Sequence, residues 1–529
     1  MNILPFKATS GCPEAFIVKG TTRERGYQYG ERFAEKWQTL ITIIKASILG
    51  TPFTNSMYGV VPPTEETLNK DMKALFYLAG KYCPDYIEWL EGIQEGLAFR
   101  GIEFSIEDII MAAQYPSDRW GRPGSSYPVE SGLIENSGAG TPSKPYCNGY
   151  AATGNTTKEK NVIVGVNGSN SDETPDRIIL VSYNDDGTYF TSFGPVTHPF
   201  GQGCIKSTGY AFIQTAMTSE TNCEWGICPE MATFHIANSC NSKEEAMEWI
   251  KDIPRAFATG NFLFGDADGN ITGCETNSAH YFVRHPGDAD EEGDYIVVTN
   301  HFSTPDTIGL NVPEMDAWKE SSVARHATIS KLIKKTETEG GLDIEGVKRI
   351  LRCDDWYDYN KDEWHYNEPG STMGSNLLEY THSAFFNVTE MAAYFMQGPG
   401  AGVGVPAGAM GEFIKIPLAD DISTMIELMM IDAFFMNYHP IRAEFLRVRN
   451  ASKTLRQDFA SQVALEELLN TSYRSYEEAL NKWAFAYIDK HKKGENSNYF
   501  RLMGQAMTCL GKSQLYVKRL MTQLSMYEV

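Results

Sequence analysis

The sequence lacks several features that would assign it to a common class. No stretch approaches the run of about 18 apolar residues that a membrane-spanning helix needs, and the N-terminus, MNILPFKATSGC, has no long apolar run of the signal-peptide kind. The ten cysteines are scattered and form no C-x-x-C pair, which disfavours a zinc ribbon and a disulfide framework. We therefore expect a reduced compartment, a cytoplasmic protein and no membrane insertion.

Positive charge is also scarce. Lysine and arginine number 46 against 68 aspartates and glutamates, for a net charge of -22. Such a surface repels phosphate, so no nucleic-acid partner is expected. The glycine-rich stretch Gly398–Gly411 lacks the GK[ST] of a phosphate loop, and Asp266–Asn270 lacks the spaced ligands of a calcium loop, so a hairpin turn is expected there. We expect neither a metal nor an organic cofactor.

The 529 residues are enough for a large core and for two or more domains. Helical spacing dominates residues 1–114, and a low-pattern linker covers residues 115–146. Strand patterns with hairpin turns begin at residue 147 and extend to about residue 420, interrupted by helices. Residues 421–529 are helical almost throughout and predict an added region that caps the core or builds a homo-oligomer. This order indicates the α+β class, with antiparallel sheets covered by helices.

Two local predictions concern element boundaries. Thr22–Leu49 has helical spacing with few breakers and predicts helical structure. Asp354–Glu368, DDWYDYNKDEWHYNE, is acidic and aromatic, and it is more typical of a solvated loop than of a pocket lining for a cationic group.

One cysteine stands where a loose segment meets the first strand. Pro128–Tyr146 is rich in Gly, Ser and Pro, and Cys147 follows it directly, before a predicted hairpin over Tyr150–Thr153 and Asn161–Val166. A cut between Tyr146 and Cys147 would give Cys147 a free α-amine, whose pKa of about 7.7–8.0 suits a base near neutral pH. A thiol beside such an amine is a self-sufficient nucleophile.

Four stretches in order resemble one enzyme family. They are Gly20–Gly30 (GTTRERGYQYG), Cys147 with the strands after it, Asn261–Glu275 (NFLFGDADGNITGCE) and Val298–Phe302 (VTNHF). They are similar to segments of the N-terminal-nucleophile (Ntn) hydrolases of the C45 family, the acyl-CoA:6-aminopenicillanate acyltransferase-like proteins. Phospholipase B-like proteins and choloylglycine hydrolases are more distant relatives. The resemblance extends from about residue 14 to 415 and implies the αββα sandwich, two antiparallel sheets between two helical layers.

The resemblance also implies roles for individual residues. Cys147 would be the nucleophile and Tyr146–Cys147 the self-cleavage site, although Tyr146 is larger than the residue that relatives often have there. Asn300, with Asn261, would hold the oxyanion, since an amide N–H is a suitable donor; a strand-end turn or cap is the alternative for each. His301 would orient Asn300 or serve the structure.

A second group matches the relatives less well. Where choloylglycine-type relatives have N-x-D, this chain has Asn167, Gly168 and Ser169, so Asn170 or Asp172 would have to supply the missing polar group; an Asx turn is the alternative. Arg23 and Arg25 could reach an acidic substrate, but structural ion pairs are the stronger expectation.

Together these features predict an autoprocessing cysteine hydrolase. It would cleave a linear, non-peptide amide of a small molecule, or transfer the acyl group through a thioester. The alternatives are a phospholipase B-like lipid amidase or esterase, and a non-catalytic binding or scaffold protein that retains the fold.

Overall fold

The structure is a computed structural model that divides into two compact units, residues 13–413 and residues 414–529 with 1–12. It describes residues 14–49, 64–114, 147–168, 177–217, 226–256, 260–289, 293–311, 316–351, 353, 355–365, 382–397, 413–418, 445, 448, 452, 455, 458–493 and 498–527. The domain boundary expected at residue 421 stays a prediction, because it lies outside the described residues.

The described N-terminal helices are α1 (Thr22–Arg32), α2 (Ala34–Ile48), α4 (Glu65–Tyr82), α5 (Pro84–Phe99) and α6 (Ile106–Ala113). The helical structure expected over Thr22–Leu49 is confirmed, with a break at Phe33. Phe33, at φ -105° and ψ 21°, ends α1 and precedes α2. Its ring packs 4.7 Å from the ring of Tyr29 and 5.4 Å from that of Phe16, centroid to centroid, so burial of this ring accompanies the break.

Helices α1 and α5 approach each other unusually closely. Their contact is lined by two glycines from each helix, Gly26, Gly30, Gly92 and Gly96. A Cβ on Gly26 would lie 2.3 Å from the Trp89 carbonyl oxygen, and one on Gly92 would lie 2.1 Å from the Arg23 carbonyl oxygen. Two of the three glycines in the stretch Gly20–Gly30 therefore serve helix packing.

The larger sheet has the strand order β1-β4-β5-β6-β7-β8-β9-β10. Its members are β1 (Glu14–Gly20), β4 (Arg177–Asn184), β5 (Tyr189–Pro195), β6 (Gly203–Lys206), β7 (Tyr210–Thr215), β8 (Asn261–Asp266), β9 (Ile271–Thr276) and β10 (Tyr281–Arg284). Strand β1 pairs with β4 in parallel, and the later neighbours are antiparallel. As expected, residues 266–270 form a hairpin turn, in which the Asp266 carboxylate accepts the backbone N–H groups of Asp268 and Asn270.

The second sheet contains β11 (Tyr295–Val298), β2 (Asn148–Ala152), β3 (Ile163–Gly168), β14 (His382–Asn387) and β15 (Ala392–Gln397), in that order. These neighbours pair antiparallel. The predicted hairpin after Cys147 is confirmed as β2 and β3. Strand β2 lies between β11 and β3, so the candidate nucleophile precedes an interior strand and not an edge.

Alternating side chains show how the layers stack. Ile178 and Leu180 of β4 belong to a core shared with the N-terminal helices, so the fully buried Ile179 and Val181 face the other way. On that side β2 and β3 pack against β7 and β8. Helices α8 (Pro229–Ser239) and α9 (Lys243–Asp252) join the N-terminal helices on the outer face of the larger sheet.

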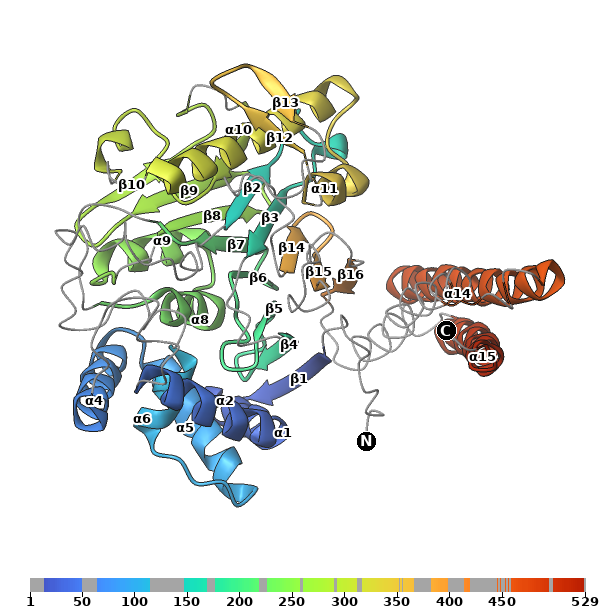
Figure 1. Cartoon of the computed structure of the whole chain (residues 1–529), viewed down its shortest axis with the longest axis horizontal. Coiled ribbons are helices and arrows are strands. Elements are labelled where there is room, and N and C mark those ends of the chain that lie inside the picture. The colour runs from blue at the N-terminus through green and yellow to red at the C-terminus, as the bar shows by residue number, and fades with distance from the viewer. Residues whose placement is uncertain are drawn as a thin grey trace. The chain divides into compact units, whose positions relative to one another are not determined.

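The outer face of the second sheet is covered in the same way. Tyr150 of β2 and Ile163 of β3 share a core with α10 (Asp316–Thr338) and α11 (Ile344–Leu351). The order is therefore helices, sheet, sheet, helices, with the yellow α10 and the blue helices on opposite sides in Figure 1. The predicted α+β class and αββα sandwich are confirmed.

The acidic, aromatic stretch is not the solvated loop that its composition predicted. Residues within it form a hairpin of β12 (Trp356–Asp358) and β13 (Glu363–His365). Trp356 stacks on His365 with ring centroids 4.2 Å apart, and Tyr357 pairs with Trp364. Aromatic cross-strand pairs stabilise this short hairpin despite its acidic charge. Two short 3₁₀ turns complete the unit, at Lys158–Lys160 and Ile308–Leu310.

The second unit contains β16 (Ile414–Pro417), α14 (Phe459–Lys493) and α15 (Tyr499–Leu524). The long helices form a pair whose core includes Leu465 and Leu520. In the buried middle of the pair the hydroxyls of Ser472 and Ser513 lie 3.1 Å apart. The helices expected within residues 421–529 are confirmed over the described range.

Candidate active site around Cys147

Cys147 lies at the entrance of β2 and is buried, with 4% of its surface exposed. A Cβ on Gly149 would meet the Ile213 side chain of β7, so this face of β2 is turned toward the larger sheet. Cys147 is two residues earlier and shares the same face. The thiol therefore points into the space between the two sheets.

Gln202, just before β6, reaches this thiol from the opposite sheet. Its Nε2 atom donates a hydrogen bond to Cys147 Sγ at 2.8 Å. Its Oε1 atom is buried and has no hydrogen-bond partner among the residues that the structure describes. Gly168 is the cross-strand neighbour of Cys147 if the β2–β3 register continues. Because Gly168 has no Cβ, it leaves room for the Gln202 side chain; a Cβ there would lie 1.8 Å from Gln202 Oε1. The nucleophile thus has a fixed donor beside it.

Arg325 of α10 reaches the same residue from the other face. This buried guanidinium donates one hydrogen bond to the Cys147 carbonyl oxygen at 2.5 Å and another to Asn300 Oδ1 at 2.9 Å. Asn300 Nδ2 in turn donates to the Ala216 carbonyl at 2.6 Å. Arg325 therefore holds the candidate nucleophile and one predicted oxyanion residue in a fixed relation.

Asn261 contacts the residue that precedes Asn300. Its Nδ2 donates to the Thr299 carbonyl at 3.0 Å, and the Thr215 hydroxyl donates to the same oxygen at 2.9 Å. These bonds anchor the residue before Asn300 to the larger sheet. Within the described part of the chain, the buried Asn261 Oδ1 has no hydrogen-bond partner. The contacts give Asn261 a supporting position next to Asn300.

His301 belongs to a network that fixes the end of β11. Its Nδ1 atom lies 2.7 Å from the Ser322 hydroxyl and 3.0 Å from that of Thr299. The Ser322 hydroxyl also accepts the Asn300 backbone N–H at 2.8 Å. His301 shares its partner with Asn300, so it is placed where it can orient that residue.

Asn167 lies beside the site but faces away from the thiol. It is the cross-strand partner of Asn148, and its Nδ2 donates to the Leu351 carbonyl of α11 at 3.3 Å. Its Oδ1 accepts the Ser383 hydroxyl. Asn167 therefore ties β3 to the outer helices. The other predicted positions in this region, Tyr146, Ser169, Asn170 and Asp172, lie outside the described residues.

Arg177, the first residue of β4, faces the space between the sheets, as its alternation with Ile178 requires. Its guanidinium lies 6.0 Å from the centroid of the Phe193 ring, and that ring is 5.8 Å from the His382 ring of β14. Burial lowers the pKa of Arg177 to about 9, and the negative charge that Cys147 would carry when ionised opposes that change. Burial, reinforced by Arg177, holds the pKa of His382 well below its usual value.

The N-terminal arginines have structural roles. Arg23 forms ion pairs with Glu91 and Glu95 of α5, at 2.8 and 2.6 Å, as expected. Arg25 is buried and donates hydrogen bonds to Ser182 and Asn238, at 2.6 and 2.7 Å, so it joins α1 to β4 and α8 through hydrogen bonds and not through an ion pair.

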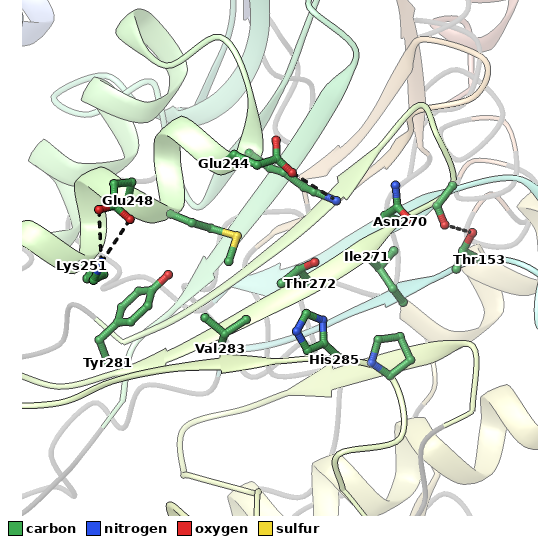
Figure 2. A pocket seen from close by; sticks show the side chains of 14 residues that line it. Thr153, Glu244, Glu248, Lys251, Asn270, Ile271, Thr272, Tyr281, Val283 and His285 are labelled. Carbon is green, nitrogen blue, oxygen red and sulfur yellow. Dashed lines mark hydrogen bonds and ion pairs between the residues drawn. The ribbon is translucent and has the colours of Figure 1, made fainter.

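A separate hollow of about 910 Å³ lies between α9 and strands β9 and β10 (Figure 2). Its lining includes Thr153, Lys251, Tyr281 and His285. Thr153 follows the far end of β2, so about 20 Å of strand separates it from Cys147 at a rise of about 3.3 Å per residue. The hollow holds none of the predicted site residues.

Three side chains of the β12–β13 hairpin could supply metal ligands. The ligand atoms of Asp358, Glu363 and His365 lie within 4.8 Å of one another. Lys361 Nζ is 3.1 Å from the Asp358 carboxylate, so a positive charge already accompanies the group. We assign no metal to it.

Comparison with known proteins bears on the predicted family. The family model described as Acyl-coenzyme A:6-aminopenicillanic acid acyl-transferase matches residues 156–367. The resemblance to this family is confirmed. The match begins just after β2 and includes Asn261, Asn300 and Arg325. The match supports the prediction of an enzyme of the Ntn amidohydrolase and acyltransferase class.

Solved structures give only distant likenesses, and we draw no chemistry from them. The N-acylethanolamine-hydrolyzing acid amidase ortholog of Caenorhabditis elegans is 10% identical with a TM-score of 0.32, and the likeness covers 46% of this chain and 93% of that one. A mutant of the conjugated bile acid hydrolase from Clostridium perfringens is 11% identical with a TM-score of 0.29, with 47% and 89% covered. A search of curated proteins found no match. In the described part of the chain, no helix has the length and apolar character needed to cross a membrane.

Sequence reasoning missed four residues around Cys147, namely Arg177, Gln202, Arg325 and His382. Two of them left a signal. Arg325 lies on the buried stripe of α10 with Ile329, and Arg177 opens an apolar strand on its buried face; a charge in such a position is rarely left inside without a role. Gln202 and His382 carry no such mark, because their contacts depend on how the two sheets stack.

Proposed function

We propose that this protein is an autoprocessing cysteine Ntn hydrolase that cleaves a linear amide or transfers its acyl group. The observation that carries the proposal is the position of Cys147. Its thiol enters the space between the sheets at the start of an interior strand, with Gln202 on the sulfur, and Arg325 joins the Cys147 carbonyl to Asn300. This is the arrangement that a nucleophile at a new chain terminus requires.

The first step forms a thioester. Cys147 Sγ attacks the substrate carbonyl carbon, and the α-amine of Cys147 takes the thiol proton. Asn300 Nδ2 has two N–H bonds, and while one donates to Ala216 the other can donate to the oxyanion. When the C–N bond breaks, the α-amine returns the proton to the leaving amine.

The second step releases the acyl group. Water attacks the thioester and yields an acid, or a second amine attacks and yields a new amide; in both cases the thiol is regenerated. Which acceptor reaches the thioester decides between amidohydrolase and acyltransferase. Asn261 and His301 support this geometry by holding the Thr299–Asn300 segment in place.

Intact mass tests the self-cleavage directly. We expect a cut between Tyr146 and Cys147 that gives fragments of 146 and 383 residues, since 529 minus 146 is 383. The Cys147 thiol attacks the Tyr146 carbonyl, the peptide nitrogen leaves as the new α-amine, and water resolves the thioester. Cys147→Ala should stay whole, and Cys147→Ser should cut slowly because a hydroxyl is a weaker nucleophile.

Cys353→Ser is the matched control, because Cys353 is a partly exposed cysteine outside the candidate site whose thiol donates to the Asp355 carbonyl. It should be cut like the wild type. The contrary result is a wild-type chain that stays whole and hydrolyses an amide at the same rate as Cys147→Ala. It would show that the nucleophile is another residue.

A further inference from the structure

The helix pair of the second unit, α14 and α15 (Figure 1), exposes a large share of the apolar surface. Among the described residues, twelve large apolar side chains are exposed, and six of them lie within residues 459–527. The six are Val463 of α14, Phe500, Met507, Leu515 and Met521 of α15, and Met526 just after it. Apolar side chains gathered in this way mark interaction sites in soluble proteins.

Four positions of α15 form one row on its exposed side. Phe500, Gly504, Met507 and Gly511 follow the i, i+4, i+7, i+11 spacing of residues that share a helix face. All four are exposed, and Phe500 retains 87% of its accessible surface. We call these four positions the outer row of α15. Large side chains and glycines alternate along it.

The two glycines of the outer row have no packing role within the described part of the chain. An added Cβ on Gly504 or Gly511 would meet no described atom within 4 Å. Glycine inside a helix also costs stability relative to alanine, so two exposed glycines in one helix favour a close approach by another backbone. Helices α1 and α5 of this molecule already make such a contact through glycines from both partners.

The spacing of the outer row is complementary to itself. With a two-fold axis between residues 505 and 506, two antiparallel α15 helices place Phe500 of one copy opposite Gly511 of the other. The same axis places Met507 opposite Gly504, because both pairs are symmetric about that point. Each large side chain then meets the space left by a glycine, as ridges meet grooves in helix packing. A parallel contact in register would set Phe500 against Phe500 and glycine against glycine.

We propose that the outer row of α15 is a homodimer interface, in which two copies of this chain pair antiparallel about residues 505 and 506. Positions 500 and 511 are about 16 Å apart along the helix at a rise of 1.5 Å per residue. The contact is therefore shorter than that of a permanent dimer, and association should depend on protein concentration. The proposal does not depend on the chemistry proposed for Cys147.

Charge distinguishes a second copy from an anionic lipid surface as the occupant of this row. Helix α15 contains four basic residues and no acidic one; the four are Arg501, Lys512, Lys518 and Arg519. Two such helices repel each other, so added salt should tighten the dimer, whereas salt weakens attraction to anionic lipid. A lipid surface would also leave the two exposed glycines without a purpose. The alternation of large residues and glycines favours the second copy.

Sedimentation equilibrium of the full chain tests the association. The mass should rise from 59.1 kDa toward twice that value as the protein concentration increases, and more so at high salt. Gly511→Leu should weaken the dimer by about tenfold or more, because the new side chain fills the space opposite Phe500. Leucine favours a helix more than glycine does, so this loss cannot come from a weakened α15. Gln505→Leu, at an exposed position outside the outer row, should dimerise like the wild type.

Disulfide trapping tests the register. A disulfide needs Cα atoms within about 7 Å, so positions 500 and 511 of the same helix cannot be joined. In Phe500→Cys/Gly511→Cys we expect a bond between position 500 of one copy and position 511 of the other, identified by peptide mass spectrometry. Phe500→Cys and Gly511→Cys alone should form no covalent dimer through these positions, because each lies about 16 Å from its own copy in this register.

The contrary results are distinct. A mass that stays at 59.1 kDa at every concentration would overturn the proposal. Phosphatidylserine vesicles that then bind the wild type but not Phe500→Ser would identify a lipid surface as the occupant. Lower stability of a monomeric Phe500→Ser without vesicle binding would identify another segment of the same chain. Covalent dimers of the single variants would show a parallel contact, and wild-type association of Gly511→Leu would place the dimer interface elsewhere.

Discussion

At the scale of single residues, Arg325 connects the proposed nucleophile, Cys147, to the proposed oxyanion residue, Asn300. Its two hydrogen bonds fix the Cys147 carbonyl and Asn300 Oδ1 relative to each other. Arg325→Met removes both bonds, and misplacement of reacting groups by about 1 Å can cost about 10²-fold in rate. We expect self-cleavage to slow by about that factor, measured as the half-life of the uncut chain on gels.

Arg325→Lys keeps the charge but loses the planar fork, so it can serve only one of the two acceptors and should fall between the wild type and Arg325→Met. Arg474→Met, which removes an exposed arginine paired with Glu467, should cut like the wild type. Wild-type cleavage in a folded Arg325→Met chain would refute this role of Arg325.

The site was only partly predictable from the sequence. Cys147 can be predicted because a Gly/Ser/Pro-rich segment ends there and a strand begins. Asn300 can be predicted from the resemblance of the Val298–Phe302 stretch to the family. Asn167 was placed near the nucleophile by its position along the chain, but the two-residue alternation of β3 turns its side chain to α11. Gln202 could not be assigned, because its contact with Cys147 comes from sheet stacking, which local pattern does not encode.

At the scale of elements, the α1–α5 glycine contact leaves no room for a side chain. A Cβ on Gly92 would lie 2.1 Å from a backbone oxygen of α1, and backbone cannot move aside as a flexible side chain can. Overpacking of this kind costs about 1–3 kcal/mol. We expect Gly92→Ala to lower the free energy of unfolding by that amount in a denaturant titration.

Gly80→Ala is the control within the same helical layer. A Cβ there has its nearest neighbour at 4.0 Å, so the substitution should be neutral or stabilising by up to about 1 kcal/mol through helix propensity. Equal effects of the two alanines would show that the helix contact has room to spare.

Two elements that sequence reasoning missed, α8 and β6, show no readable periodicity in the sequence. Helix α8 is buried on nearly all sides, so its apolar residues show no 3.6-residue stripe. Strand β6 has only four residues, too few for an alternation to be read. The hairpin after Cys147 and the capped helix at Ser105 were predictable, because their signals are local: turn residues in one case, and in the other a capping box in which Ser105 and Asp108 bond each other's backbone N–H.

At the scale of the whole molecule, buried histidines make the fold sensitive to acid. Burial lowers the pKa of His198 to about 4 and holds those of His326 and His382 well below the usual value. Below about pH 6.5 the unfolded chain binds protons that the folded chain refuses, so stability falls as pH falls toward the folded pKa. For His198 this contribution is up to about 1.4 kcal/mol per pH unit in that window.

We expect the free energy of unfolding to fall between pH 6 and pH 5, with His198 contributing about 1 kcal/mol of that drop, measured in urea on the uncut Cys147→Ala chain. His198→Gln should reduce that drop by about 1 kcal/mol, whereas His285→Gln, at an exposed position after β10, should leave it unchanged. An unchanged slope in His198→Gln would refute the assignment.

Strand β1 has a consequence for the life of the enzyme after the proposed cut. It lies before residue 146, yet it pairs along seven residues with β4, and the helices that follow it share one core with the larger sheet. The cut therefore turns one chain into two subunits that only packing and hydrogen bonds hold together. Once they separate, the tether that kept them at an effective concentration of about millimolar is gone, so reassembly becomes a second-order reaction. The mature enzyme would then endure by the slowness of its unfolding, and each molecule that unfolds in dilute solution would be lost.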